Sequence, residues 1–250
     1  MRPRWGNGPA TITLVRHGES LGNLADERAR QARASRLDLD QRDADVVLSP
    51  AGREQAEAVG AWLDEAEDDW RPDVVLTSPY QRAAETAERA VAGRRIEVLL
   101  DERLRERDLG LFDGLTGFGI REQYPEEATR RTKLGKFYYQ PPSGESWADV
   151  VLRVRSLLDD LRHGYDEARV WMFTHQAVIM GFRYVLEGLA EKDLLEIDRQ
   201  VQIPNASFTR FRRASDVFEL DCFADPRAID AADARVTHEA SSAGAGHEQP

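Results

Sequence analysis

The stretch TITLVRHGES, residues 11–20, carries the first clear signal of the fold. Its β-branched, apolar half, TITLV, stops at the polar tripeptide Arg16-His17-Gly18. A short apolar run that ends in polar and glycine residues is typical of a buried strand followed by a loop. We therefore expect a strand at 11–15, with an arginine and a histidine directly after its carboxyl end.

Three further runs of the same kind follow along the chain. They are DVVLTS at 73–78, RIEVLL at 95–100 and ARVWMFTH at 168–175. Segments with helical spacing separate them, among them one that starts at Ser49-Pro50, a favourable helix start, and a long one that ends at Gly164. Two later runs, SFTRFRR and DVFELDC, are typical of a closing β-hairpin. This alternation predicts an α/β sandwich with a mostly parallel central sheet.

Composition indicates one domain with flexible ends. Residues 1–9 are rich in Gly, Pro and Arg, which predicts a flexible N-terminal lead, and residues 10–223 are expected to form a single domain. Residues 224–250 are rich in Ala, Asp, Ser and Gly and predict a disordered tail. Inside the domain, residues 24–45 are highly charged with little apolar spacing, which predicts a solvated helix or a mobile excursion. Residues 101–142 have no clear period and are expected to be irregular.

Charge and composition exclude several classes of partner. The chain has 250 residues, is 41% hydrophobic and carries a formal net charge of -11. Such an acidic balance argues against nucleic acids and anionic membranes, since both need an extended positive surface. The single cysteine, Cys222, allows no internal disulfide and no cysteine-rich metal site. The N-terminal segment lacks the apolar core of a secretory signal, and no run is long enough to cross a bilayer, so we expect a cytoplasmic protein.

Charged and imidazole side chains follow three of the four predicted parallel strands. Arg16 and His17 follow the first, Ser78 ends the second with Arg82 one helical turn beyond it, and His175 ends the last. The carboxyl ends of parallel strands form the ligand-binding edge of such a sheet. The sequence therefore predicts a local positive site at this edge of an acidic protein.

The residue types in this predicted site suit phosphoryl transfer. The arginine fork matches phosphate oxygens, and each guanidinium disfavours protonation of a neighbouring histidine. A neutral imidazole is a nucleophile, so we expect His17 to attack phosphorus through one ring nitrogen while the other donates to a backbone carbonyl. Arg16, Arg82 and His175 are expected to clamp the phosphoryl oxygens without a metal ion or other cofactor. Asn23, expected in the loop after the first strand, offers a further hydrogen-bond donor to the substrate.

A leaving alkoxide needs a proton, and Glu106 in LRERDLGLFDG is the best candidate donor. A carboxyl group close to a bound phosphate dianion favours its protonated form until the proton is used. In a second step the same carboxylate is placed to activate the water that hydrolyses phosphohistidine. Glu102 and Asp108 lie nearby in the sequence and are the competing candidates for this role.

Five motifs together resemble those of the histidine phosphatase superfamily, also called phosphoglycerate mutase-like. In order along the chain they are VRHGES with Asn23 beyond it, TSPYQRAAETA, LRERDLGLFDG, PPSGES and FTHQAVI, spanning residues 11–213. The resemblance implies a three-layer α/β/α sandwich and makes His17 the phosphorylated nucleophile. It also implies a phosphate pocket of Arg16, Arg82 and His175, with Glu106 as the proton donor.

Details of the motifs bear on the subfamily. The stretch KFYYQPPSGESWADVVLRV is similar to that of broad-specificity phosphatases, whereas THQAV, with Gln176 after the histidine, resembles the fructose-2,6-bisphosphatase branch. Gln176 is therefore a candidate substrate-binding residue. Asp113 replaces a frequent glutamate, and Gly22 stands where mutases usually carry tryptophan. These departures argue against a mutase.

Three functions stay open from the sequence. The first is hydrolysis of a phosphomonoester of a small anionic metabolite. The second is phosphoglycerate mutase activity, which would convert 3-phosphoglycerate to 2-phosphoglycerate instead of releasing phosphate. The third is a regulatory protein that binds phosphate without turnover, although such proteins usually lack the nucleophile or the acid. Substrate selectivity is expected to come from residues 24–45 and 115–142.

Several residues also allow an ordinary structural role. Arg162-His163-Gly164 repeats the RHG tripeptide, but it ends a predicted helix and is explained as a helix C-terminus. Glu145 is expected either to cap the helix that begins near Ser146 or to orient a pocket arginine, with the structural role favoured.

Overall fold

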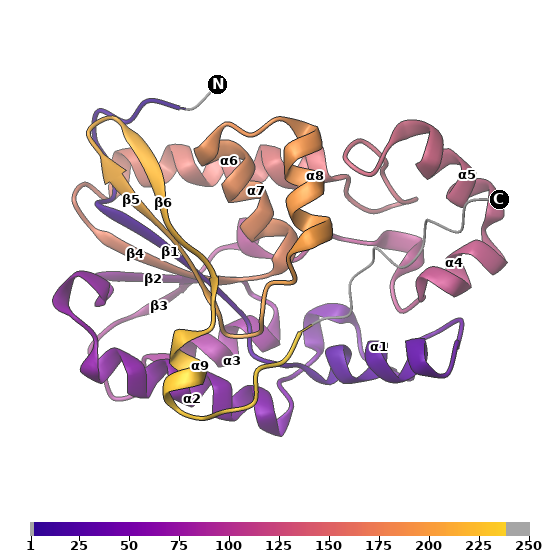
Figure 1. Cartoon of the computed structure of the whole chain (residues 1–250), viewed down its shortest axis with the longest axis horizontal. Coiled ribbons are helices and arrows are strands. Elements are labelled where there is room, and N and C mark those ends of the chain that lie inside the picture. The colour runs from indigo at the N-terminus through magenta and orange to yellow at the C-terminus, as the bar shows by residue number, and fades with distance from the viewer. Residues whose placement is uncertain (1–2, 239–250) are drawn as a thin grey trace.

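The fold is built on one six-stranded sheet, seen in a computed structural model that describes residues 3–238 (Figure 1). The strands are β1 (Thr11–Arg16), β2 (Val74–Thr77), β3 (Val98–Leu100), β4 (Arg169–Thr174), β5 (Phe208–Ala214) and β6 (Val217–Asp225). Their order across the sheet is β3-β2-β4-β1-β5-β6. The first four strands in this order are parallel, and the β5–β6 hairpin adds two antiparallel strands beside β1. The prediction of a mostly parallel sheet closed by a hairpin is confirmed.

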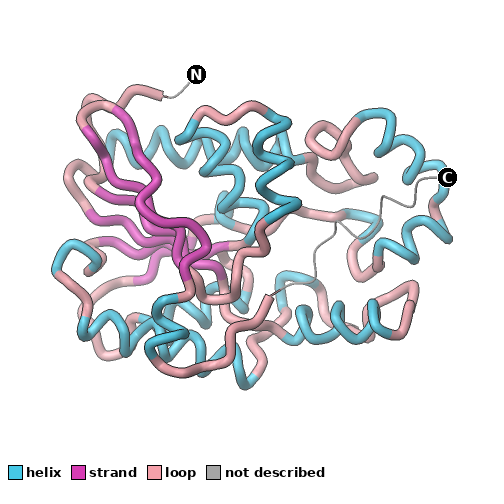
Figure 2. The backbone as a smooth tube through the Cα atoms, viewed as in Figure 1, coloured by secondary structure: helices cyan, strands magenta, loops and turns pink. Residues whose placement is uncertain are grey.

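Helices cover both faces of this sheet, which gives the predicted three layers (Figures 1 and 2). The longer helices are α1 (Leu21–Gln31), α2 (Pro50–Glu65), α3 (Gln81–Ala90), α4 (Gly117–Gln123), α5 (Pro125–Leu134), α6 (Trp147–Gly164), α7 (Gln176–Glu187), α8 (Glu191–Gln200) and α9 (Arg227–Ala231). Helices α6 and α7 pack on one face, and α2, α3 and α9 pack on the other. Of these helices, α4, α5, α8 and α9 were not expected from the sequence.

The strands divide their side chains between two cores, as period-two alternation requires. On β1, Ile12 and Leu14 face the core shared with α6 and α7, whereas Val15 faces the core shared with α2 and α3. On β4, Trp171 and Phe173 join the second core. Burial on both faces fixes the register of β1 and β4, because a shift by one residue would exchange the two sets.

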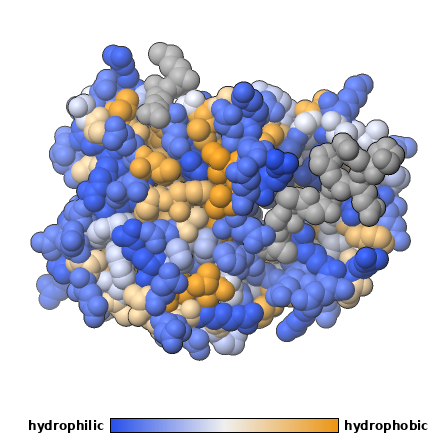
Figure 3. All heavy atoms as spheres, in the orientation of Figure 1, coloured by the Kyte–Doolittle hydropathy of each residue, from blue (hydrophilic) through white to orange (hydrophobic). Residues whose placement is uncertain are grey.

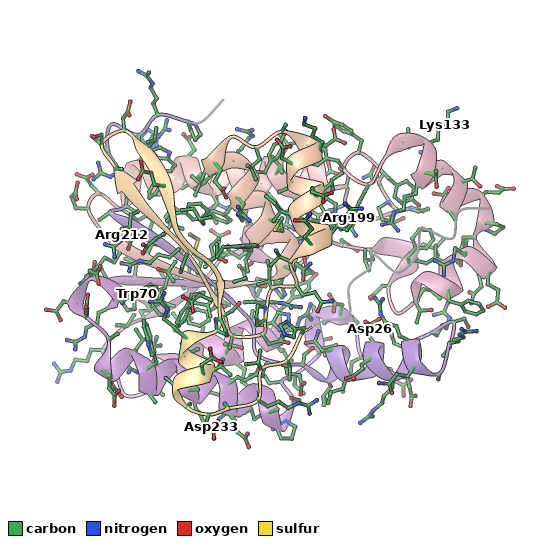
Figure 4. The ribbon with its side chains drawn as sticks, viewed as in Figure 1. Asp26, Trp70, Lys133, Arg199, Arg212 and Asp233 are labelled. Atoms are coloured by element: carbon green, nitrogen blue, oxygen red, sulfur yellow. The ribbon has the colours of Figure 1, made fainter. Side chains whose placement is uncertain are left out.

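The segments at 24–45 and 115–142 lie together beyond the carboxyl edge of the sheet. The backbone N–H of Thr116 donates to Ser35 at 3.1 Å, and that of Leu37 donates to Gly114 at 2.9 Å. Figure 4 places Asp26 on α1 and Lys133 at the end of α5, at the opposite side of the molecule from the hairpin that carries Arg212. The predicted excursion begins as helix α1, and the region expected to be irregular contains α4 and α5.

Both ends of the described chain are packed where flexible segments were predicted. Trp5 is 1% exposed and contacts Phe218 edge-on with ring centroids 4.8 Å apart, so the N-terminal lead is anchored at this residue. Helix α9 buries Ala228 and Ile229 against α2, which anchors the start of the segment expected to be a tail. Few but well-spaced apolar residues are enough to anchor both segments. Residues 1–2 and 239–250 lie outside the described residues.

The surface is largely polar. Figure 3 shows hydrophilic side chains over most of the face in view, with smaller apolar patches between them. Among residues 3–238, none of the helices has the length and apolar character that a membrane crossing needs.

The packing of α9 makes a stability prediction. Ile229→Ala should lower the free energy of unfolding by about 2–5 kcal/mol, because it leaves a cavity in the core beneath α2. Leu152→Ala, at a position that is 64% exposed, is the control and should change it by less than about 0.5 kcal/mol. Urea denaturation measures both variants. Equal, small effects would mean that α9 does not pack as described.

Candidate active site

His17 lies directly after β1 in a buried loop. The imidazole is 3% exposed, and its Nδ1 lies 2.7 Å from the carbonyl oxygen of Gly18. A carbonyl oxygen can only accept a hydrogen bond, so Nδ1 is the protonated nitrogen of the neutral ring and Nε2 carries the lone pair. The fold thus selects the tautomer that makes Nε2 a nucleophile.

The loop is held by a close approach of two backbone segments. The N–H of Gly18 donates to Thr86 Oγ1 at 3.0 Å, and Gly18 lies against the first turn of α2. A Cβ atom on Gly52 would come within 1.9 Å of the carbonyl oxygen of Glu19. Position 52 therefore requires glycine for the loop to keep its place.

Two arginines flank this imidazole. Arg16 is 1% exposed and donates from Nη1 to the carbonyl of Ile203 at 2.5 Å. Arg82 is 5% exposed and lies in the first turn of α3, which follows β2. Burial, then the charges of Arg82 and Arg16, hold the pKa of His17 well below its ordinary value. His17 is therefore neutral near pH 7.

His175 completes the cluster from the end of β4. Its ring centroid lies 5.1 Å from that of His17, and its Nε2 lies 2.9 Å from Ser78 Oγ. Burial is the largest cause that lowers the pKa of His175, followed by the charge of Arg82. Its Nδ1 has no hydrogen-bond partner among residues 3–238, which leaves a buried polar atom that a bound anion can satisfy.

The structure therefore brings Arg16, His17, Arg82 and His175 together, as the strand order predicted. Backbone hydrogen bonds extend the sheet at this edge, from His17 N–H to Thr174 and from Ser78 N–H to Phe173, both at 2.9 Å. Two guanidinium groups and two neutral imidazoles form a site with the charge and geometry to bind a phosphate group.

Asp43 is a site residue that sequence reasoning missed. Arg82 donates from Nη1 to the backbone carbonyl of Asp43 at 2.6 Å and from Nη2 to its Oδ2 at 3.1 Å. Tyr80 lies beside this pair, with the Arg82 guanidinium 5.2 Å from its ring centroid. Burial, followed by the charge of Asp43, raises the pKa of Tyr80 to about 12. Nothing in the sequence of the charged segment distinguishes Asp43 from its acidic neighbours.

Glu106 follows a segment that is tied to the end of β4, the strand that His175 follows. The short helix η3 (Glu102–Leu104) is tied to the end of β4, because Thr174 Oγ1 donates to the carbonyl of Leu104 at 2.7 Å. Glu106 follows two residues later and is half-buried, with its Oε1 accepting from the N–H of Arg107 at 2.7 Å. Its role as a proton donor remains a prediction.

Asn23 and Gln176 each lie in the first turn of a helix and bond protein groups there. Asn23 is in the first turn of α1, not in a loop, and its Oδ1 accepts from the N–H of Ser20 at 3.0 Å in a capping box. Gln176 begins α7, and its Nε2 donates to Asp198 Oδ1 at 3.2 Å, while Lys136 Nζ contacts the same carboxylate at 2.5 Å. Substrate binding by either residue remains a prediction.

The C-terminal segment is also linked to the loop that carries His17. Asn205 Nδ2 donates to the carbonyl of His17 at 3.0 Å, and Gln55 Oε1 accepts from the N–H of Glu19 at 2.8 Å. Thr237 joins the two, accepting from Gln55 Nε2 at 2.9 Å and donating to Asn205 Oδ1 at 3.1 Å. The contacts of Thr237 could not be predicted from the composition of the tail, because a single threonine outside any periodic segment does not indicate a buried position.

Two expectations concern groups outside the cluster. His163 is exposed in the last turn of α6, with Nδ1 2.8 Å from the carbonyl of Asp159, as expected for a helix C-terminus. Among the described residues, no group of three or more His, Cys, Asp and Glu side chains is placed to hold a metal ion.

Comparison with known proteins identifies the family. Residues 12–226 match the family model of the histidine phosphatase superfamily (branch 1). The chain is 34% identical over 198 residues to the phosphoglycerate mutase-like protein AT74 of Arabidopsis thaliana. It is 30% identical over 203 residues to a 6-phosphofructo-2-kinase/fructose-2,6-bisphosphatase of Caenorhabditis elegans. These matches cover 75% and 81% of this chain but only 57% and 38% of the relatives' own lengths.

Solved structures are similar along most of the chain. The mycobacterial glucosyl-3-phosphoglycerate phosphatase in complex with VO3 has a TM-score of 0.69 at 27% identity, covering 86% of this chain and 99% of that one. YhfR of Bacillus stearothermophilus has a TM-score of 0.68 at 27% identity, covering 86% and 96%.

The lowered pKa values of the two buried histidines predict how stability depends on pH. In the unfolded chain a histidine protonates near its ordinary pKa of 6.5, whereas His17 and His175 protonate only at lower pH in the fold. As the pH falls from about 6.5 toward that lower pH, the unfolded state binds more protons than the folded state, so acid lowers the free energy of unfolding. The expected slope is up to about 1.4 kcal/mol per pH unit for each histidine.

His17→Gln, which keeps a neutral polar side chain, should remove up to one histidine's share of this slope. Urea denaturation at about pH 7.5, 6 and 5 measures it. His163→Gln, which removes an exposed imidazole, is the control and should keep the native slope. A native-like slope in His17→Gln would contradict the inferred neutral state.

Proposed function

Because the chain belongs to the histidine phosphatase superfamily, we propose that it hydrolyses a phosphomonoester of a small anionic metabolite through a phosphohistidine on His17. One observation carries the proposal: a neutral imidazole, fixed through Nδ1, is buried close enough to two buried guanidinium groups for both charges to lower its pKa. The pairing supplies a nucleophile and a phosphate clamp within a single buried cluster.

The first step transfers the phosphoryl group to the enzyme. The lone pair of His17 Nε2 forms a bond to phosphorus while the ester P–O bond breaks and the leaving oxygen takes the electron pair. Arg16, Arg82 and His175 stabilise the charge that spreads over the three equatorial oxygens. Glu106 donates a proton to the leaving oxygen, which then departs as an alcohol.

The second step releases phosphate. Glu106, now a carboxylate, removes a proton from a water molecule that attacks phosphorus, and the P–N bond to His17 breaks. The nitrogen recovers its lone pair, and Glu106 recovers its proton. The hydrogen bond from Nδ1 to Gly18 keeps the Nε2 atom of the ring toward phosphorus in both steps.

The charge of the chain and the relatives support the proposed substrate class. A buried pair of arginines suits a compact anion, whereas the net charge of -11 disfavours nucleic acids and anionic membranes. Two similar proteins carry the names of a glucosyl-3-phosphoglycerate phosphatase and a fructose-2,6-bisphosphatase, both named for small phosphorylated compounds. Residues 24–45 and 115–142, which pair beyond the carboxyl edge, are proposed to select among such substrates.

The test is hydrolysis of p-nitrophenyl phosphate in excess EDTA. The native protein should turn over, and His17→Ala should lose at least about 10³-fold in kcat, because the nucleophile is absent. His163→Ala is a matched control, since it changes the histidine of the second RHG tripeptide, and it should keep native activity. Activity that survives in His17→Ala, or that EDTA abolishes, would overturn the proposal.

A further inference from the structure

Glu145 and Arg153 form a buried ion pair next to the segment that carries Glu106. Arg153 Nε donates to Glu145 Oε1 and Arg153 Nη2 donates to Glu145 Oε2, both at 3.1 Å. The two side chains are 14% and 10% exposed. Such a bidentate pair is geometrically specific and holds both partners in one orientation.

The pair reaches the backbone on each side of Glu106. Arg153 donates from Nη1 to the carbonyl of Arg103 at 2.6 Å and from Nη2 to the carbonyl of Glu106 itself at 3.3 Å. On the other side, Glu145 Oε2 accepts from the N–H of Asp108 at 3.1 Å. The Glu145 N–H donates to the Asp108 carbonyl at 2.9 Å. Hydrogen bonds from Glu145 and Arg153 therefore fix the backbone on both the N-terminal and the C-terminal side of Glu106.

The side chains that flank Glu106 are tied to the same carboxylate or its backbone. Arg105 Nη2 donates to Glu145 Oε1 at 2.5 Å, and Arg107 Nη1 donates to the Glu145 carbonyl at 3.4 Å. The loop that follows Glu106 and the loop that precedes Glu145 also pack backbone against backbone. A Cβ on Gly110, whose φ is +53°, would lie 2.2 Å from the carbonyl oxygen of Pro142.

Helix capping does not account for Glu145. Helix α6 is capped by Ser146, whose Oγ accepts from the Asp149 N–H at 3.1 Å, and Asp149 Oδ2 accepts from the Ser146 N–H at 2.8 Å. The expectation that Glu145 caps this helix is wrong. Its carboxylate is directed at the Glu106 segment instead.

We propose that Glu145 and Arg153 are positioning residues for Glu106, and this proposal rests on the proposed function. A general acid must lie within hydrogen-bond reach of the atom it protonates, so a loosened backbone at 105–108 removes proton donation before it removes phosphate binding. The two residues touch neither the phosphate cluster nor the nucleophile through any hydrogen bond among those described.

The experiment compares leaving groups. Purified native protein, Glu106→Gln, Glu145→Gln and Arg153→Lys are assayed with 2,4-dinitrophenyl phosphate, whose leaving group needs no proton, and with glycerol 2-phosphate, whose alkoxide needs one. For Glu145→Gln, kcat/KM on glycerol 2-phosphate should fall at least about 10-fold more than on the aryl ester. Arg153→Lys should show the same preference, because lysine cannot make the bidentate contact.

Glu187→Gln on α7 is the matched control. Glu187 is 13% exposed and pairs with Arg183, which is 7% exposed, so the change perturbs a similar buried ion pair. It should lower both activities equally or not at all. In addition, Glu106→Gln combined with Glu145→Gln should be no slower than Glu106→Gln alone, since a missing acid needs no positioning.

The outcomes distinguish a failure of the positioning role from a failure of the proposed function. Equal losses of Glu145→Gln and Arg153→Lys on the two esters, or no loss at all, would overturn the positioning role while Glu106→Gln still shows the preference. If Glu106→Gln shows no preference, the acid assignment and the positioning role both fail. Inactivity of the native protein on both esters would reject the proposed function itself.

Discussion

The hydrogen bond between His17 Nδ1 and the carbonyl of Gly18 is the interaction on which the site depends. It places the proton on Nδ1 and the lone pair on Nε2, which makes one nitrogen a nucleophile. Two features of the fold favour this bond. The loop that carries His17 begins where β1 ends, at the carboxyl edge of the sheet. The loop also lies against Gly52, which has no side chain to push it away. The backbone packing of this loop therefore fixes both the tautomer and the orientation of the His17 ring.

Burial of the arginine and histidine side chains sets the charge states in the site. The site of this acidic protein holds two almost fully buried guanidinium groups, which is costly unless each finds partners. Arg16 bonds the carbonyl of Ile203, and Arg82 bonds Asp43, so both are positioned before a substrate arrives. The same burial, with these charges, keeps His17 and His175 neutral. In the proposed function, phosphate binding and the nucleophilicity of His17 would therefore have a common cause.

The strand pattern was enough to predict the sheet and to place Arg16, His17, Arg82 and His175 at its edge, because long apolar runs and strand ends are local signals. Asp43 and Glu145 could not be predicted in their roles, since each is one acidic residue among many and its partner is distant in sequence. Trp5, Ile229 and Thr237 anchor segments whose composition suggests disorder. Their contacts depend on tertiary packing, which composition does not record.

The most direct measurement of the central claim is identification of the phosphorylated atom. Protein mixed with a phosphate ester is quenched within one turnover, and the phosphorylated peptide is mapped with the nitrogen assigned. The account predicts acid-labile phosphate on Nε2 of His17, because Nδ1 is committed to Gly18. Phosphate on Nδ1, on another residue, or on no residue while turnover proceeds would contradict it.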